Sequence, residues 1–162
     1  MPSFDVVSEP DMHEVQNAFD QAIREVRQRY DFQGTDANLE QLDDGFKATA
    51  NSEERAKAIG NVLEDKFIKR KLSLKYLDTQ DAQPAGGQMW LMNIKIKKGL
   101  DSPNAKKIVA MIKDDKKLKV TPAIQGDLVR ITGKKKDNLQ DAMGLLRDAD
   151  LEVALSFKNF RD

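Results

Sequence analysis

The chain has no cysteine among its 162 residues and only one histidine, His13. Without thiols it forms neither disulfide bonds nor a thiolate metal site, and it has no cysteine nucleophile. A single histidine also cannot complete the His/Cys ligand set of a zinc site. The lack of disulfides fits the reducing cytosol, so we expect a cytoplasmic protein that holds no metal.

Long hydrophobic runs and the common catalytic motifs are missing as well. No stretch approaches the ~18 apolar residues that a membrane-spanning helix needs, and the first residues lack the basic and apolar segments of a secretory signal. There is no Walker A loop, no G-x-G-x-x-G after a predicted strand and no G-x-S-x-G turn. We therefore expect no membrane partner, no cofactor and no enzymatic activity.

An excess of charge of one sign is the third absence, because 27 basic side chains balance 27 acidic ones. Nucleic-acid-binding proteins usually carry a basic excess, so the total argues against that function. The balance hides an asymmetry, however. Residues 1–83 have 11 basic and 17 acidic side chains (net −6), whereas residues 84–162 have 16 and 10 (net +6). The second half thus stays a candidate for binding a polyanion.

Each half shows the hydrophobic pattern of the same series of elements, strand–helix–strand–strand–helix–strand. The clearest strand spans residues 90–97, where every second residue is apolar and lies on one face. Helices are predicted to begin near Asp11, Ser52, Ser102 and Asp137, all residues that cap helix N-termini well. Hairpins are predicted at residues 43–45 and 126–127. The segment 79–87 lacks periodicity and ends in Pro-Ala-Gly-Gly, which predicts a linker between the halves.

Two βαββαβ series predict an α+β fold with two ferredoxin-like (split βαβ) domains. Each domain is expected to be a four-stranded antiparallel sheet with two helices on one face. The other face of each sheet must be solvated, paired with a partner or used for binding. On this pattern alone, the domains are residues 1–83 and 88–162. Units of ~80 residues have small cores, so docking or oligomerisation would add stability.

The basic side chains of the second half are the strongest candidates for function. They gather around residues 95–98, 113–119 and 134–136, and clustered lysines bind phosphate groups with little sequence specificity. The alternative is structural, since lysines also favour helix C-termini and the edges of sheets. The predicted phosphate-binding residues are Lys95, Lys97, Lys113, Lys116, Lys117, Lys119, Arg130, Lys134, Lys135, Lys136, Lys158 and Arg161.

Aromatic residues make up only 6% of the chain, and no RNP1-like run is present. Recognition of a base on a sheet of this kind needs aromatic side chains on the open face. Phe4, Trp90 and Phe160 are the candidates for stacking on a base. The alternative for Trp90 is a core position, because the residues two, four and six positions later are apolar.

Several motifs, in order, resemble the bacterial YajQ family of nucleotide-binding proteins. They are the opening Met1 to Glu9, the residues Tyr30-Asp31-Phe32 after the first predicted helix, the blocks between residues 106 and 134, and the ending Phe157 to Asp162. The resemblance runs from end to end. Pro122 departs from the more polar residues of the family, and because proline lacks an amide donor we expect it at a sheet edge or a bulge.

The resemblance implies that the two domains exchange their first strands. Residues 11–83 with the strand 88–98 would then form the first domain, and residues 1–10 with 100–162 the second. It also implies a protein that binds nucleotides or RNA, and in some members cyclic di-GMP, without catalysis.

Together these observations favour a non-enzymatic protein that binds RNA or a guanine nucleotide, GTP or cyclic di-GMP, through the lysine-rich surface of the second domain. The rival hypothesis is a protein-interaction adaptor or regulator whose partner binding is controlled by a nucleotide. In that case the oppositely charged halves of two chains would favour a homo-oligomer. Lysines recognise phosphate rather than the base, so the sequence leaves the identity of the nucleotide open.

Overall fold

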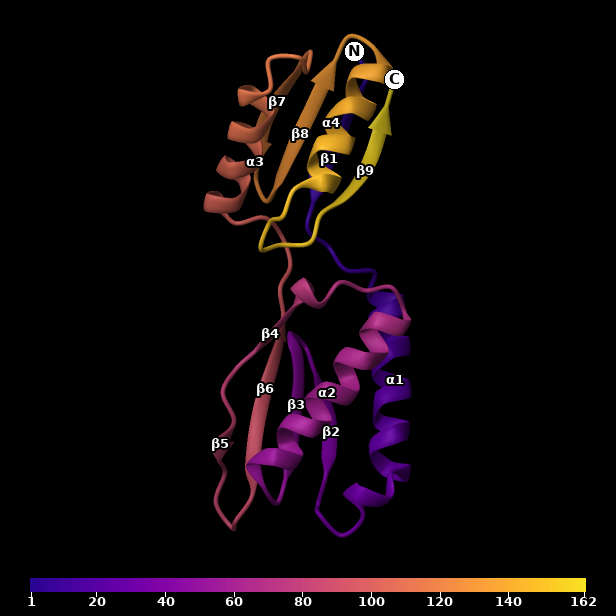
Figure 1. Ribbon diagram of the computed structural model, residues 1–162, viewed down its shortest axis with the longest axis vertical. Helices are drawn as coiled ribbons and strands as arrows, with labels where there is room; N and C mark the ends of the chain where they lie inside the picture. Colours follow the sequence, from indigo (N-terminus) through magenta and orange to yellow (C-terminus); the bar gives the residue numbers. More distant parts are fainter. The chain divides into compact units, whose positions relative to one another are not determined.

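The computed structural model describes all 162 residues, which divide into two compact units. Unit 1 consists of Met1–Glu9 and Lys98–Asp162, and unit 2 of Pro10–Lys97 (Figure 1). The chain therefore passes between the units twice. One sheet lies in each unit, and four helices complete an α+β fold, which confirms the predicted fold class. None of the helices is long and apolar enough to span a membrane.

Unit 1 combines a strand from the start of the chain with elements from its second half. Its sheet has the order β7-β8-β1-β9, with every pair antiparallel. Helices α3 and α4 cover one face of this sheet, and the other face carries no helix (Figure 1). The elements are β1 (Ser3–Val7), α3 (Ser102–Asp114), β7 (Val120–Gln125), β8 (Leu128–Gly133), α4 (Lys136–Asp148) and β9 (Ser156–Arg161).

Unit 2 has the same topology, with β6 in the place that β1 takes in unit 1. Its sheet has the order β2-β3-β6-β4. β5 lies along the same edge of β6 as β4 does, but it pairs with the first residues of β6, Trp90 and Leu91, whereas β4 pairs with the last. The elements are α1 (Met12–Gln28), η1 (Tyr30–Phe32), β2 (Asn38–Leu42), β3 (Gly45–Ala50), α2 (Glu53–Lys69), η2 (Leu74–Tyr76), β4 (Leu77–Thr79), β5 (Gln83–Pro84) and β6 (Trp90–Ile96).

The segment 79–87 is not a linker, so that prediction is wrong. It belongs to unit 2, where β4 and β5 form an interrupted edge strand and a tight turn leads into β6. Ala85 donates its backbone N–H to the carbonyl of Met89 at 2.8 Å, and Gly86 and Gly87 have φ of +78° and +56°. Glycine is frequent in tight turns because it adopts positive φ without strain, and the same residues also mark linkers.

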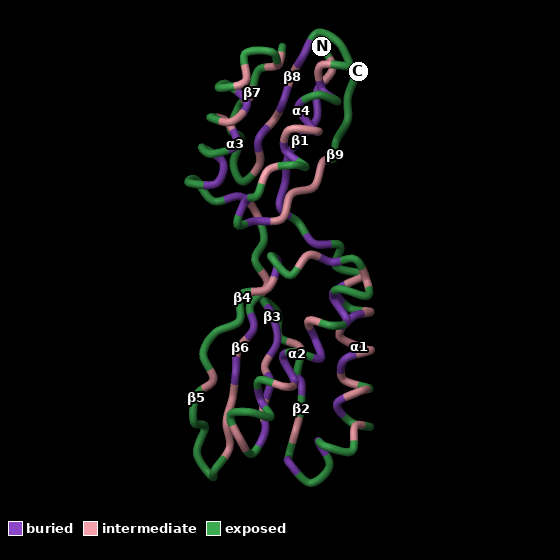
Figure 2. Tube along the Cα trace, in the orientation of Figure 1, coloured by how far each residue is buried: buried purple, intermediate pink, exposed green.

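Each unit has its own core, built by the alternation of side chains along the strands. In unit 1, Phe4 and Val6 of β1 point toward the helices and are fully buried. In unit 2, Met92 and Ile94 of β6 do the same, as their spacing predicts. Figure 2 shows the buried stretches along the central strands and the inner sides of the helices.

Local signals at the element ends account for most of the boundaries. Asp11 caps α1 by accepting from the backbone N–H groups of His13 and Glu14. The cap of α3 is Asp101 rather than the predicted Ser102, because its carboxylate accepts from the N–H of Asn104 at 3.0 Å. Pro122 lies on β7, an edge strand of unit 1, as its missing amide donor requires.

Candidate anion-binding surface

A pocket of about 420 Å³ opens in unit 1 where β7, β8 and α4 meet. We call it the lysine pocket, because three of its side chains are ammonium groups and none is acidic. Two hydroxyls and one amide complete its polar lining. The lining residues are Met1, Lys119, Thr121, Thr132, Gly133, Lys134, Lys135 and Asn138.

The end of β8 and the start of α4 place these side chains. β8 ends at Gly133, and Lys134 and Lys135 alone connect it to the first residue of α4. A Cβ at Gly133 would come within 3.4 Å of the Cβ of Asn138, so the missing side chain leaves room for the helix beside the strand. Lys135 occupies the N-cap position of α4, and no side-chain hydrogen bond caps the first N–H groups of the helix. The partial positive charge of this helix end therefore adds to that of the lysines.

The chemistry of the lysine pocket suits a phosphate-like anion. Ammonium groups supply charge and three donors each, and hydroxyl and amide groups supply further donors at fixed positions. Lys136 lies next to the pocket but is engaged elsewhere, since its Nζ pairs with Asp162 at 2.7 Å. The hydrogen bond that its ammonium donates to that carboxylate raises the pKa of Lys136. Lys134 and Lys135 are thus the cations of the predicted 134–136 run that line the pocket.

A second group of cations lies on the open face of the same sheet. Arg130 on β8 and Arg161 on β9 flank Asp5 on β1, and Asn159 reaches the same carboxylate. We call these four residues the guanidinium cluster. Arg130 donates from Nε to Oδ1 of Asp5 at 2.9 Å, and Nη2 of Arg161 lies 3.6 Å from Oδ2. Lys158, which directly precedes Asn159 on β9, pairs with Glu9.

Asp5 is only 1% exposed although it lies on the face without helices. Burial by itself would raise the pKa of Asp5, but hydrogen bonds from Arg130 and Asn159 and the charges of the two arginines outweigh it. The pKa of the carboxyl group therefore lies below its ordinary value, and the group is ionised at neutral pH. The Asp5 hydrogen bond in turn raises the pKa of Arg130.

The remaining predicted cations are not part of either group. Lys113 lies in the last turn of α3, and Lys116 and Lys117 follow it as exposed residues of the turn before β7. Lys95 and Lys97 are exposed residues of unit 2, on and after β6. The lysine pocket and the guanidinium cluster thus contain Lys119, Arg130, Lys134, Lys135 and Arg161 of the predicted set.

The three stacking candidates have different surroundings. Phe4 is fully buried, with its ring stacked on Phe160 at 5.8 Å and edge-on to Phe157 at 5.5 Å. No ring face of Phe4 is accessible to a base, so we leave it out of the site. Trp90 packs against the core of unit 2, half-buried. Phe160 is 59% exposed, with one face of its ring against Phe4.

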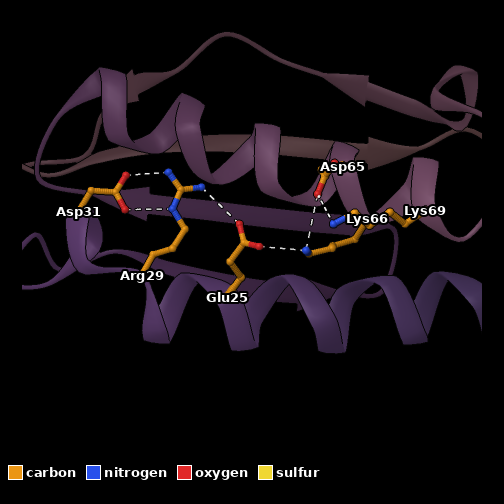
Figure 3. A network of polar contacts seen from close by, with 6 residues as sticks. All are labelled: Glu25, Arg29, Asp31, Asp65, Lys66 and Lys69. Carbon is orange, nitrogen blue, oxygen red and sulfur yellow. Dashed lines mark hydrogen bonds and ion pairs between the residues drawn. The ribbon is translucent and has the colours of Figure 1, made fainter.

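Sequence reasoning did not identify an ion-pair network in unit 2, shown in Figure 3. Lys66 of α2 is 8% exposed, and its Nζ lies 2.9 Å from Glu25 of α1, which also pairs with Arg29 at 3.3 Å. The hydrogen bond from Lys66 lowers the pKa of Glu25 despite its partial burial. The network continues through Asp31 at one end and Asp65 and Lys69 at the other. A signal was available, because Lys66 interrupts the apolar face of the predicted helix.

The charges in this network balance, so it serves mainly to connect α1 and α2. Three carboxylates alternate with three cations along the chain of contacts (Figure 3). A hollow of about 460 Å³ beside it is lined by Gln21, Arg24, Glu25, Gln28, Arg29, Lys66 and Lys69. Glu25 lies among those cations, whereas the lysine pocket has no acidic lining residue. The lysine pocket is therefore the better candidate for an anion.

Comparisons with known proteins identify the family of the chain. Residues 2–161 match the family model described as "Nucleotide-binding protein YajQ-like". A nucleotide-binding protein of Anaeromyxobacter sp. (strain Fw109-5) is 50% identical, one of Pseudomonas putida (strain GB-1) 48% and one of Tolumonas auensis 45%, and each alignment covers 100% of both chains. The chain belongs to the YajQ-like protein family.

Proposed function

We propose that the chain binds RNA or a guanine nucleotide, GTP or cyclic di-GMP, through unit 1. The observation that carries this proposal is the lysine pocket, which combines three lysines and two threonines with no acidic lining residue. The names of the relatives, all nucleotide-binding proteins, support the same class of ligand. In this proposal a phosphate group occupies the pocket.

The open sheet face extends the proposed surface beyond the pocket. Thr132 pairs in register with Ser3, and Ser3 with Arg161, so these side chains form one row across β8, β1 and β9. Side chains two positions apart on a strand share a face, which puts Arg130 on the same side as Thr132. A ligand with more than one phosphate would thus contact the lysine pocket and the guanidinium cluster together. Phe160 does not extend this surface, because its ring stacks on Phe4, on the side of the sheet that faces the helices.

The proposed role is binding without catalysis. The pocket lining contains neither a histidine nor a carboxylate that could act as a general base. His13, the one histidine, lies in the first turn of α1 in unit 2. Lysine contacts to phosphate give affinity that falls with salt and depends little on sequence.

The test is calorimetric titration with GTP, cyclic di-GMP, ATP and a short single-stranded RNA, each at low and at moderate salt. Lys134→Ala/Lys135→Ala removes two pocket cations, and for RNA we expect weaker binding and a salt slope reduced by about 1 to 1.5. Lys106→Ala/Lys107→Ala makes the same change of charge on the exposed side of α3 and serves as the matched control. Equal losses in both variants, or none in either, would contradict the proposed surface.

A further inference from the structure

The buried carboxylate of Asp5 has no role in the core and calls for an explanation. It lies on the sheet face opposite Phe4 and Val6, where a polar side chain is normally solvated. Yet only 1% of it is exposed, and removing a charge from water is costly unless the charge is paired and hydrogen-bonded. Asp5 meets that condition through three side chains from two different strands.

A bulge in β9 delivers one of these partners. Asp5 is in register with Lys158, but Ser3 is in register with Arg161, so β9 has one residue more than β1 between the two pairs. Asn159 is that extra residue, and its φ of +57° is a left-handed conformation that non-glycine residues rarely adopt. The bulge turns the amide of Asn159 to Asp5, where Nδ2 donates to Oδ2 at 2.9 Å. Bulges often redirect a side chain in this way next to functional sites.

The contacts of Asp5 fix the orientation of two guanidinium groups. Arg130 uses Nε and Nη2 toward the two carboxylate oxygens, at 2.9 and 3.5 Å. Two of its five N–H donors are engaged in this way, and three remain. Arg161 approaches Oδ2 with Nη2 at 3.6 Å. The side chains of Arg130 and Arg161 keep 32% and 47% of their surface exposed, so neither is closed off from a ligand.

We infer that Asp5 is a positioning residue for anion binding: it holds Arg130 and Arg161 so that their free N–H groups form a preset contact for a second phosphate of the ligand. This inference rests on the proposed function, because it assigns the lysine pocket to one phosphate and the guanidinium cluster to the next. The planar guanidinium fork suits a phosphate only when its orientation is held, since two parallel N–H groups must meet two oxygens.

A purely electrostatic view makes the opposite prediction, which allows a sharp test. Asp5→Asn removes a negative charge beside the surface, so Coulomb attraction alone would raise the affinity for an anionic ligand. If Asp5 positions the arginines, the same substitution lowers the affinity for a short single-stranded RNA by about threefold to tenfold, the range for losing an oriented hydrogen bond. Fluorescence anisotropy with a labelled RNA measures the change, and circular dichroism checks that the variant is folded.

A second variant keeps the test decisive if Asp5→Asn does not fold. Arg130→Lys keeps the charge of the cluster but removes the fork, so the positioning role predicts a similar loss of affinity with little change in the salt slope. A role limited to charge, or to holding the strands together, predicts unchanged binding by this variant. Both variants are compared with the wild type in the same anisotropy titration.

Lys134→Ala/Lys135→Ala distinguishes failure of the proposed function from failure of the positioning role of Asp5. If Lys134→Ala/Lys135→Ala weakens RNA binding while Asp5→Asn and Arg130→Lys bind as tightly as the wild type or more tightly, the positioning role is overturned and the proposed function stands. If the pocket variant binds as the wild type does, the proposed function fails and the inference fails with it. Loss of affinity in all three variants supports both.

Discussion

The two units share one topology, but their central strands, β1 and β6, carry different side chains at the equivalent position of the open sheet face. In unit 1, the row across the open sheet face contains Asp5 on β1 and Arg130 on β8. The corresponding row of unit 2 contains Asn93 on β6 and Lys47 on β3. Lys47 pairs at 3.5 Å with Glu40 of the edge strand, and both side chains are exposed. One fold thus carries a buried ionic cluster on one open face and an ordinary surface pair on the other.

The buried charge of unit 2 lies instead on the helical side, in the Glu25–Lys66 pair. There it joins two helices, and the cations of the network are matched by carboxylates. In unit 1, the cluster around Asp5 has two arginines for one carboxylate, and both arginine side chains stay partly exposed. Buried charge thus connects two helices in unit 2, whereas in unit 1 we propose that it presents donors to a ligand.

The division of the chain also changes the meaning of its charge pattern. The two halves of the sequence carry net charges of −6 and +6, but the units do not follow the halves. Unit 1 contains 14 basic and 12 acidic side chains, net +2, and unit 2 contains 13 and 15, net −2. Net charge therefore says little about which unit binds an anion. The proposal that unit 1 binds the anion rests instead on the local arrangement in the lysine pocket and the guanidinium cluster.

The largest effect is expected from Phe4→Ala, which tests whether the two cores are separate. Phe4 is fully buried in the core of unit 1, and loss of a buried phenylalanine costs about 3–5 kcal/mol. The single tryptophan, Trp90, packs on the core of unit 2. In a urea titration we expect far-UV circular dichroism to show early loss of part of the structure, while the Trp90 fluorescence transition stays in place.

The control for this experiment is Phe46→Ala, which truncates a buried side chain of unit 2. It should move the Trp90 transition to lower urea. A shift of the Trp90 transition by Phe4→Ala as large as that caused by Phe46→Ala would contradict the assignment of β1 to unit 1.

A smaller effect is expected from Glu25→Gln, which removes the carboxylate charge opposite the nearly buried ammonium of Lys66 but keeps an acceptor oxygen. A hydrogen bond between charged groups contributes about 1.5–3 kcal/mol, so we expect a loss of unfolding free energy of up to this size. Adding Lys66→Met should recover part of it, because methionine replaces the aliphatic stem without a charge. The Trp90 transition in urea measures both. If the double variant is less stable than Glu25→Gln, the pair is not the source of the effect.

Acid unfolding of unit 1 should reveal the charge on Asp5. Its folded pKa is lowered, so the ionised form binds to its partners only in the folded state and folding is linked to loss of a proton. The stabilisation is complete above the unfolded pKa, about 4, and is lost as the pH falls toward the lower folded pKa. Asp5→Asn should therefore flatten the fall in stability of unit 1 below about pH 4. An identical pH profile for wild type and variant would show that the carboxyl is not ionised in the fold.

The smallest effect is expected from Lys47→Ala, the counterpart of Arg130 in unit 2. Exposed pairs contribute about 0.2–1 kcal/mol, so unfolding should change by no more than this and RNA binding should not change. Arg130→Ala is the matched comparison, and it should cost more because Asp5 stays buried without one of its two donors at 2.9 Å. If Lys47→Ala and Arg130→Ala lower the free energy of unfolding in urea equally, the two open sheet faces do not differ in the way described.

Much of the fold could be predicted because it depends on local patterns. The alternation along residues 90–97 identified β6 and its buried face, and Asp11 and Ser52 identified the starts of α1 and α2. The turn at residues 85–89 was misread as part of a linker, since proline and glycine mark both. Which sheet a strand joins depends on contacts distant in sequence, and periodicity does not contain them.

The candidate site was predictable only in part for the same reason. Lysine clusters are visible in sequence, so Lys134 and Lys135, which line the pocket, could be proposed from it. The pocket depends in addition on Gly133, which leaves room for α4, and on the hydroxyls of two strands. The guanidinium cluster joins Asp5 to residues more than 120 positions later and needs a bulge at Asn159. No local pattern encodes such a contact.

The most direct test of the central claim, that unit 1 provides the anion-binding surface, is a map of amide chemical shifts. ¹H–¹⁵N spectra recorded during titration with GTP, cyclic di-GMP or a short RNA report each residue separately. The account predicts that the largest shifts fall on Lys119, Thr121 and residues 130–138, followed by Asp5 and residues 158–161, with small changes in unit 2. Largest shifts around Glu25 and Lys66, or along β6 at Lys95, would contradict it.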